Sequence, residues 1–183
     1  MQWLNEPPQW AQTDPTITLT TAPQTDFWRV THYGFIRHSG HFFYDTIAGN
    51  FVAEVSIRGQ YRDLYDQAGL MVRADDHHWI KAGIEYVNGV QNLSAVVTHD
   101  YSDWSRMALP NAPKALRLRL ERRGDAIEIF YWDETENFRP FRLTYFRDAP
   151  ALQMGIMGAS PEGPGFTVTF ANYAVQRFPG QSL

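Results

Sequence analysis

A lysine and a glutamate four positions apart are the side chains of this sequence best placed to do chemistry. Lys81 and Glu85 lie in the run WIKAGIE (79–85). Successive side chains of a β-strand point to opposite faces, so both project from one face of the same strand. An ammonium and a carboxylate there can donate to and accept hydrogen bonds from the hydroxyl groups of a ligand. Two alternatives stay open, since Glu85 can act as a general acid or base assisted by Lys81, or the two can form a plain ion pair.

The spacing of the acids does not support glycosidase chemistry. A retaining glycosidase needs two carboxyl groups about 5–5.5 Å apart, and the Glu-x-Asp-x-x-Glu pattern that supplies both from one strand is absent. Glu85 is the only acid on the inferred face. The sequence therefore offers no catalytic residue set, and it favours a protein that binds over one that catalyses.

A run of acids and histidines, DDHH (75–78), offers four metal-ligand types in a row. Adjacent residues of a hairpin loop rarely converge on one ion, and no zinc-protease spacing accompanies them. Aspartate is also an ordinary turn residue. His38 and His41 are three positions apart, but in a glycine-containing stretch that is not helical. We expect neither a metal site nor a cofactor.

The strand that carries Lys81 belongs to a hairpin whose register follows from the sequence. Asn88-Gly89 lies between two apolar-rich runs and is the strongest short signal for a two-residue type I′ turn. That turn pairs Glu85 with Asn92 and continues down both strands. One face then holds only apolar residues and the other is mixed, whereas a slip by one residue would mix both faces. The predicted inward residues are Ile80, Ala82, Ile84, Leu93, Ala95 and Val97.

The run QAGLMVR (67–73) predicts a third strand beside these two. Placing Leu70 and Val72 on the inward face with Ile80 requires an odd number of residues in the connection. We therefore predict a loop of three or five residues within 74–78.

The outer face of this meander is the candidate ligand site. Glycine inside a strand marks a bulge or the close approach of a ligand or another backbone, so we expect Gly69 and Gly83 to floor a shallow groove. A polar, solvated face is the alternative, because antiparallel sheets commonly have one. For Trp104, which follows a loop, core packing and ligand binding are equal alternatives. The predicted ligand-binding residues are Tyr65, Gln67, Arg73, Trp79, Lys81, Glu85, Ser94 and Trp104.

Composition narrows the classes of partner. The chain has 183 residues, 44% of them hydrophobic and 15% aromatic, with a net charge of −4 and no cysteine. A negative chain without a clustered basic footprint is a poor nucleic-acid binder, and no apolar run approaches the about 18 residues of a membrane span. The N-terminus MQWLNEPPQW lacks the features of a secretory signal. We expect a cytoplasmic protein with no nucleic-acid or membrane partner, and either a monomer or a homodimer.

Many short strands separated by turn signals predict an all-β sandwich or barrel. No segment keeps helical periodicity, and no linker or repeat divides the chain, so we expect one domain over 1–183. The aromatic run Phe138–Phe146 is interrupted by Pro140, which predicts an edge strand or a bulge. This edge is also a candidate surface for a protein partner.

Several strings in one order resemble the domain-of-unknown-function family 1349 of bacteria and fungi. The resemblance implies a concanavalin A-like jelly-roll β-sandwich of two antiparallel sheets, one of them concave. In that superfamily the concave outer face commonly binds saccharides, so the resemblance implies a carbohydrate or a small polar ligand on the outer face described above. The strings are TDFWR (25–29), YGF (33–35), GHF (40–42), LYDQAGLMVR (64–73), WIKAGIE (79–85), SAVVT (94–98) and SDWS (102–105).

Three hypotheses about function follow. The first is a lectin-like domain that binds a small saccharide or a sugar-like metabolite on the concave outer face. The second is an enzyme acting on a carbohydrate, with Glu85 as acid/base and Lys81 beside it. The third is a non-catalytic protein-interaction module that uses the edge at 138–146.

Overall fold

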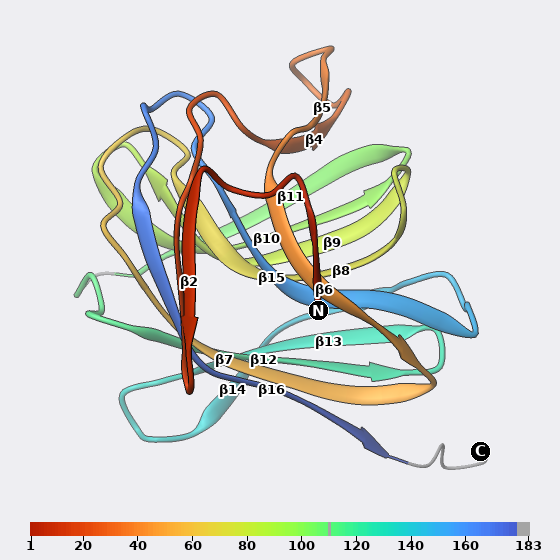
Figure 1. The fold of residues 1–183 in the computed structure, drawn as a ribbon. Coiled ribbons are helices and arrows are strands. Elements are labelled where there is room, and N and C mark those ends of the chain that lie inside the picture. The colour runs from red at the N-terminus through yellow and green to blue at the C-terminus, as the bar shows by residue number, and fades with distance from the viewer. Residues whose placement is uncertain (110, 179–183) are drawn as a thin grey trace.

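The computed structural model describes residues 1–109 and 111–178, and within them the chain forms two seven-stranded antiparallel sheets and one small hairpin (Figure 1). This confirms the predicted all-β sandwich. Sheet A has the order β1 (Gln2–Leu4), β6 (His41–Ala48), β15 (Ala151–Ala159), β8 (Gln67–Asp75), β9 (His78–Val87), β10 (Val90–His99) and β11 (Tyr101–Ala108). Sheet B has the order β14 (Phe138–Tyr145), β13 (Ala126–Trp132), β12 (Leu116–Arg123), β7 (Asn50–Gly59), β16 (Thr167–Phe178), β3 (Thr16–Thr20) and β2 (Gln9–Thr13). The hairpin consists of β4 (Phe27–Arg29) and β5 (Ile36–His38).

The main core lies between the two sheets. The strands at the centre of this core are of two kinds. Some alternate buried and more exposed residues, and others are buried on both faces, as the sequence pattern requires. Fully burying an aliphatic side chain contributes about 1.5–3 kcal/mol, so the inward residues of the meander are the main support of sheet A. They pack against residues from sheet B such as Val55, Leu118, Ile129 and Phe170.

The predicted register of the meander is confirmed. Glu85 pairs with Asn92 and Ile80 with Val97, and the turn residues Asn88 and Gly89 both have positive φ, 51° and 82°. Leu70 lies opposite Ala82 and Val72 opposite Ile80, on the inward face.

The predicted odd-length loop between the first two strands of the meander is wrong. A two-residue turn, Asp76-His77, joins β8 to β9, and Asp75 pairs with His78. The register shifts between Arg73 and Asp75, so Ala74 is a bulged residue without a partner. A two-residue turn without a bulge would place Leu70 and Val72 on the opposite face from Ile80. The one extra residue in β8 returns them to the same face.

The β4–β5 hairpin covers part of the outer face of sheet A and makes a second, smaller core there (Figure 1). Sheet A curves around this hairpin, so the covered face is the concave one. Most outward side chains under the hairpin are apolar and buried, and the polar ones there, Lys81, Thr98 and Ser102, are buried as well. The cluster, called the hairpin core below, comprises Phe27, Trp28, Phe42, Met71, Trp79, Val96, Met157 and Ala159.

The strand at the edge of sheet B is β14, as the interruption at Pro140 predicts. Ile129 pairs with Arg142 and Phe130 with Pro140, so Phe141 is an extra residue in a bulge. Leu143 and Tyr145 on this strand are 69% and 61% exposed. Among the described residues, no helix is long and apolar enough to cross a membrane.

Candidate functional site

A pocket opens on the concave face of sheet A, at the end that the hairpin core leaves uncovered. It encloses about 480 Å³ of space, the solvent at its mouth included. The floor comes from β8 and β9, one wall from β11, and the remaining walls from the hairpin and the loops 60–66 and 160–166. We name it the Glu85 pocket, and its lining residues are Asp26, Trp28, Tyr33, Phe35, Tyr65, Gln67, Lys81, Glu85, Trp104, Pro161 and Glu162.

Glu85 is a buried carboxyl held by two neutral donors. It is 7% exposed, and Ser94 Oγ and the Trp104 indole Nε1 each donate to its Oε2 at 2.7 Å. Burial raises the pKa of Glu85, while the charge of Lys81 and these two hydrogen bonds offset part of that effect. The other oxygen, Oε1, accepts no hydrogen bond from the described residues and is left for a ligand.

Lys81 does not pair with Glu85. Its Nζ donates to the carbonyl oxygen of Phe27 at 2.6 Å and lies 3.2 Å from Asp26 Oδ1. Both charges of this ion pair are largely buried, with side-chain exposures of 6% for Lys81 and 13% for Asp26. The plain Lys81–Glu85 ion pair considered from the sequence is therefore not formed, and Lys81 instead ties sheet A to the hairpin.

Several polar groups of the pocket floor bond to one atom, Asp26 Oδ1. Besides Lys81, it accepts hydrogen bonds from Gln67 Nε2 at 3.2 Å and from the backbone N–H of Phe27 at 2.7 Å. Gln67 Nε2 also donates to the carbonyl oxygen of Tyr65 at 3.2 Å. These contacts fix the Gln67 amide with its nitrogen towards Asp26, which leaves its carbonyl oxygen as an acceptor.

Two tyrosines from different segments meet at the pocket. The hydroxyl groups of Tyr33 and Tyr65 are 3.2 Å apart, and this hydrogen bond together with partial burial raises the pKa of Tyr65 to about 12. Tyr65 has a positive φ of 67°, a conformation that is rare for a bulky residue and concentrates at functional sites. Tyr65 therefore stays protonated and acts as a hydrogen-bonding group.

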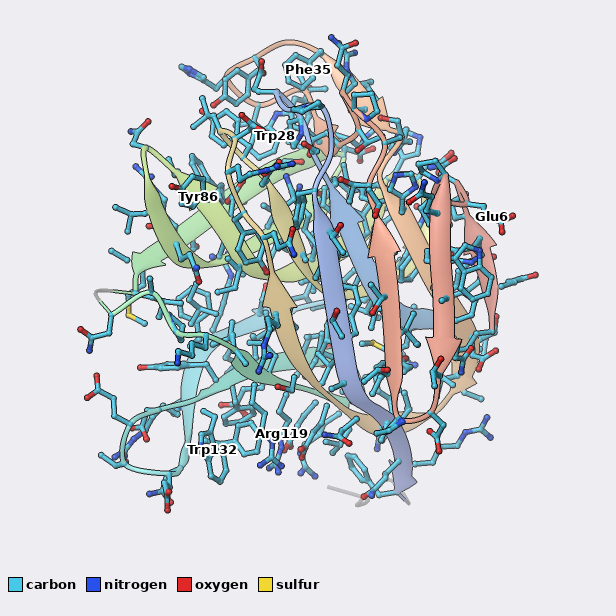
Figure 2. The ribbon with its side chains drawn as sticks, turned by 60° about the vertical axis from the view of Figure 1, so that its left-hand side comes forward. Glu6, Trp28, Phe35, Tyr86, Arg119 and Trp132 are labelled. Atoms are coloured by element: carbon cyan, nitrogen blue, oxygen red, sulfur yellow. The ribbon has the colours of Figure 1, made fainter. Side chains whose placement is uncertain are left out.

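Aromatic rings form the walls above this polar floor. Tyr33 stacks on Phe35 with ring centroids 5.4 Å apart, and its edge contacts Trp28. Tyr65 meets Trp104 edge to face at 6.3 Å. Figure 2 shows Trp28 and Phe35 on the sheet A side of the sandwich, and Arg119 and Trp132 at the opposite side.

Two further hollows adjoin the pocket. A small one is lined by Gln67, Lys81, Glu85 and Ser94 beside Gly83. A wider, more open one shares Trp28, Tyr33 and Trp104 with the Glu85 pocket and continues past them to Tyr101 and Asp103. The concave face thus offers one deep position and a shallower extension.

The two glycines predicted to floor the groove do not line the Glu85 pocket, and only Gly83 borders the small hollow beside it. Gly69 and Gly83 face each other across β8 and β9, and a Cβ on Gly83 would stand 2.0 Å from the carbonyl oxygen of Ala68. A Cβ on Gly69 would stand 1.9 Å from that of Ala82. Of the two meanings of a strand glycine considered from the sequence, the close approach of another backbone is the one observed.

The structure brings together most, but not all, of the eight residues predicted from the sequence. Tyr65, Gln67, Lys81, Glu85 and Trp104 line the Glu85 pocket, and Ser94 holds Glu85 from below. Of the two alternatives for Trp104, packing is observed: the ring packs against the hairpin core and lines the pocket, and its indole N–H donates to Glu85. Ligand binding by Trp104 stays a prediction.

Trp79 and Arg73 share the predicted face but lie outside the pocket. Trp79 is completely buried in the hairpin core, 6.1 Å from the ring of Phe27, and cannot stack under a sugar. Arg73 lies at the far end of the face and binds Gln153 Oε1 at 2.7 Å and the carboxylate of Asp76. The alternation of side chains along a strand determines which face each one is on, but the hairpin determines which part of that face is open.

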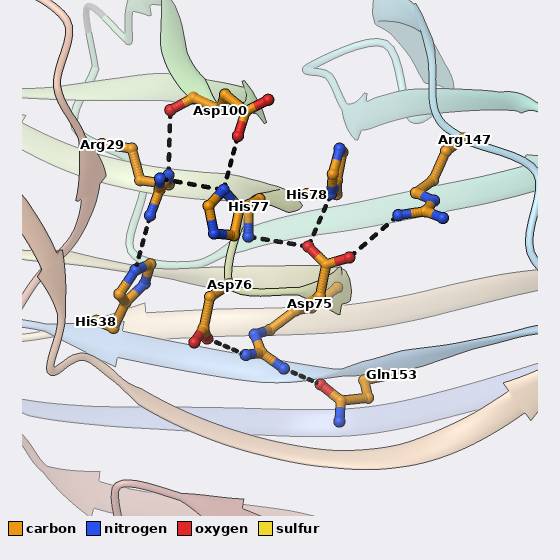
Figure 3. A network of polar contacts seen from close by, with 10 residues as sticks. Arg29, His38, Asp75, Asp76, His77, His78, Asp100, Arg147 and Gln153 are labelled. Atoms are coloured by element: carbon orange, nitrogen blue, oxygen red, sulfur yellow. Dashed lines mark hydrogen bonds and ion pairs between the residues drawn. The ribbon is translucent and has the colours of Figure 1, made fainter.

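Around the turn Asp76-His77, the DDHH run takes part in a network of linked polar contacts that do not converge on one point (Figure 3). His77 Nδ1 lies 2.6 Å from Asp100 Oδ1, and His78 Nδ1 lies 2.7 Å from Asp75 Oδ1. Arg29 bridges to His38 and His77. Over residues 1–109 and 111–178, no group of three potential ligands is placed to hold a metal ion.

Six lining residues were missed because they come from outside the meander. Asp26, Trp28, Tyr33 and Phe35 belong to the hairpin and its flank, and Pro161 and Glu162 to a distant loop. The only signal for the first four was that they lie in the strings TDFWR and YGF, which carry the family resemblance.

Comparison with known proteins agrees with that resemblance. "Regulation of enolase protein 1" of Saccharomyces cerevisiae is 39% identical over 181 residues, covering 99% of this chain and 91% of that protein. The crystal structure of a functionally unknown protein from S. cerevisiae has a TM-score of 0.92 at 39% identity, covering 98% of this chain and 97% of the other. The carbohydrate-binding module CBM66 from Bacillus subtilis shares the fold, with a TM-score of 0.62 at 15% identity and coverage of 96% and 95%. The family model described as "Protein of unknown function (DUF1349)" matches residues 3–178, and this chain therefore belongs to that family.

Proposed function

We propose that this domain binds a small saccharide, or a sugar-like polar metabolite, in the Glu85 pocket. The observation that carries the proposal is a buried polar floor beneath aromatic walls. Apolar walls with a few placed polar groups are typical of small-molecule sites. A sugar ring matches this arrangement, because its C–H faces pack on aromatic rings while its hydroxyl groups bond to the floor.

The floor has unused hydrogen-bonding capacity for such hydroxyl groups. Lys81 Nζ has three hydrogens and uses two of them on Phe27 and Asp26. Glu85 Oε1 and the Gln67 carbonyl oxygen accept nothing from the described residues. One donor and two acceptors therefore face a ligand, and leaving them unpaired would cost about 1–3 kcal/mol per buried group.

The fold supports the proposal in a limited way. A carbohydrate-binding module shares the architecture over nearly its whole length, but at 15% identity this likeness concerns the fold alone, and function resides in the site. The argument for a sugar therefore rests on the side chains of the Glu85 pocket.

A second candidate, an enzyme that acts on a carbohydrate, is favoured by one specific observation. Glu85 combines a raised pKa with a position in a partly enclosed pocket, which is how a general acid is prepared. Asp26 lines the same pocket, but its Oδ1 already bonds to Lys81, Gln67 and the Phe27 N–H. That engagement makes Asp26 a poor nucleophile, so we place binding first.

The test is a thermal-shift screen over mono- and disaccharides, followed by calorimetry. We expect at least one sugar to raise the melting temperature, and Trp104→Ala to weaken its binding at least tenfold. Glu128→Gln, on β13 of sheet B, is the control and should bind as the parent does. The proposal fails if no sugar binds, or if Trp104→Ala binds as tightly as the control.

The same samples separate binding from catalysis. Nuclear magnetic resonance of the sugar after prolonged incubation should show it unchanged if the domain only binds. A sugar converted by the parent protein but not by Glu85→Gln would establish the enzyme instead.

A further inference from the structure

The charges of the Glu85 pocket are unbalanced. Three carboxylates line it, those of Asp26, Glu85 and Glu162, against the single ammonium of Lys81. That ammonium pairs with Asp26. Within the described residues Glu85 has no cation within ion-pair distance, and its partners there are the neutral donors Ser94 and Trp104. Arg106 lies over the ring of Trp104, 5.0 Å from its centroid, but it does not line the pocket, which therefore has room for one more positive charge.

The walls of the pocket point to the same kind of ligand. Five aromatic side chains line it: Trp28, Tyr33, Phe35, Tyr65 and Trp104. The faces of Trp, Tyr and Phe rings attract a cation within about 6 Å of the ring centroid, most strongly when water is excluded. Rings above a buried carboxylate are a site for an organic cation, whereas a neutral sugar needs only the rings and the hydrogen bonds.

We infer that the ligand of the Glu85 pocket carries a protonated amine, and that it is an amino sugar. The hydroxylated part of this inference rests on the proposed function, and the amine is the addition. The ammonium would donate to Glu85 Oε1, the oxygen that the described residues leave free, and lie against the rings of Tyr65 and Trp104. The hydroxyl groups would bond to Lys81 and Gln67. A sugar phosphate is disfavoured, because its charge has the same sign as Glu85 and Glu162.

Proton linkage supplies an independent signature. Burial raises the pKa of Glu85 in the free protein, and a bound ammonium beside it would lower that pKa again. Below the raised pKa, binding must then release a proton from Glu85. Affinity for the amine should rise with pH through this range and fall again at higher pH, where the amine of the ligand loses its own proton.

The experiment compares matched 2-amino and 2-hydroxy sugars of the gluco, galacto and manno series, together with N-acetylglucosamine and glucose 6-phosphate. We expect the amine to bind at least tenfold more tightly than its hydroxyl partner in at least one series. Calorimetry in buffers of different ionisation enthalpy should show proton release. Glu85→Gln should abolish both the preference and the release, while the control Glu128→Gln keeps them.

The outcomes separate the two proposals. If neutral sugars bind as well as amines in every series, or if glucose 6-phosphate binds best, the inference is wrong and the saccharide site stands. If no sugar of any charge binds, the proposed function itself is wrong, and the inference goes with it. Retention of the amine preference in Glu85→Gln would also overturn the inference.

Discussion

Lys81 lies 3.2 Å from Asp26, a residue 55 positions away, and leaves Glu85 on its own strand without a cationic partner. The pairing does two things at once. It anchors the β4–β5 hairpin to the floor of sheet A, and it keeps Lys81 out of ion-pair contact with Glu85, whose pKa burial raises and the charge of Lys81 lowers only in part. The position of one ammonium thus shapes both the wall of the pocket and the electrostatics of its base.

Glu85→Gln should stabilise the protein at neutral pH. The folded-state pKa of Glu85 is raised, so the folded protein holds a proton that the unfolded chain releases, and stability falls as pH rises above the unfolded value. Glutamine can still accept from Ser94 and Trp104, but it has no charge to bury. We expect a gain of about 1 kcal/mol, or about 2–4 °C in melting temperature, at pH 7–8 and none near pH 4. Melting curves across that range test this, and an equal gain at both pH values would contradict it.

Lys81→Met should destabilise the fold, because it leaves the carboxylate of Asp26 largely buried and unpaired. Removing one member of a buried pair costs about 3–5 kcal/mol. Asp26→Asn in the same chain removes the stranded charge, so the double variant should recover part of the loss. Urea denaturation of the two single variants and the double variant gives the coupling free energy between Lys81 and Asp26. Additive losses would show that the pair is not formed.

Gly83→Ala should be strongly destabilising although it adds one methyl group. A Cβ there would stand 2.0 Å from the carbonyl oxygen of Ala68, which belongs to the backbone and cannot rotate away. We expect a loss of about 3 kcal/mol, at the upper end of overpacking. Gly49→Ala is the control, since its positive φ of 70° is strained but no atom lies within 4 Å. Chemical denaturation measures both, and an equal loss would point to backbone strain alone.

Longer sugars should use the open extension past Tyr33. Tyr101 is 63% exposed and lines that extension with Asp103, and neither residue lines the Glu85 pocket. We expect Tyr101→Ala to weaken binding of a di- or trisaccharide about fivefold to tenfold, since stacking contributes about 1 kcal/mol. Binding of the monosaccharide should not change. Calorimetry with a sugar series tests this, and equal losses for short and long sugars would place the ligand elsewhere.

The meander was predictable from the sequence because two independent signals fix it. Period-two alternation sets the faces of residues 80–97, and Asn88-Gly89 sets the turn, so the register follows without tertiary information. The connection at 74–78 was not predictable, because an even turn with a bulge and an odd turn give the same parity. Local pattern cannot distinguish them.

The site was predictable only in part, since a face is a local property and a pocket is not. The side chains of Met71, Trp79 and Val96 point to the outer face of the sheet and are apolar. In the sequence, these apolar residues were the evidence that another segment covers this face. The covering segment, 26–38, contacts them from about 40 to 70 positions away. Its aromatic residues look like ordinary strand residues until the chain is folded, which is why Trp79 was expected to bind a sugar.

The hairpin core sits on the opposite face of sheet A from the sandwich core, and the two share no side chain. Buried polar contacts tie the hairpin to sheet A as well: Lys81 bonds to Asp26 and to the carbonyl oxygen of Phe27, and the backbone N–H of Arg29 donates to Ser102 Oγ. Sheet A therefore carries buried packing on both of its faces, and the hairpin and the sandwich are coupled through it. A substitution of Tyr33, which is 42% exposed, can therefore change a wall of the Glu85 pocket without removing a buried side chain, whereas a substitution of Phe27 or Asp26 disturbs the packing and the ion pair that hold the hairpin.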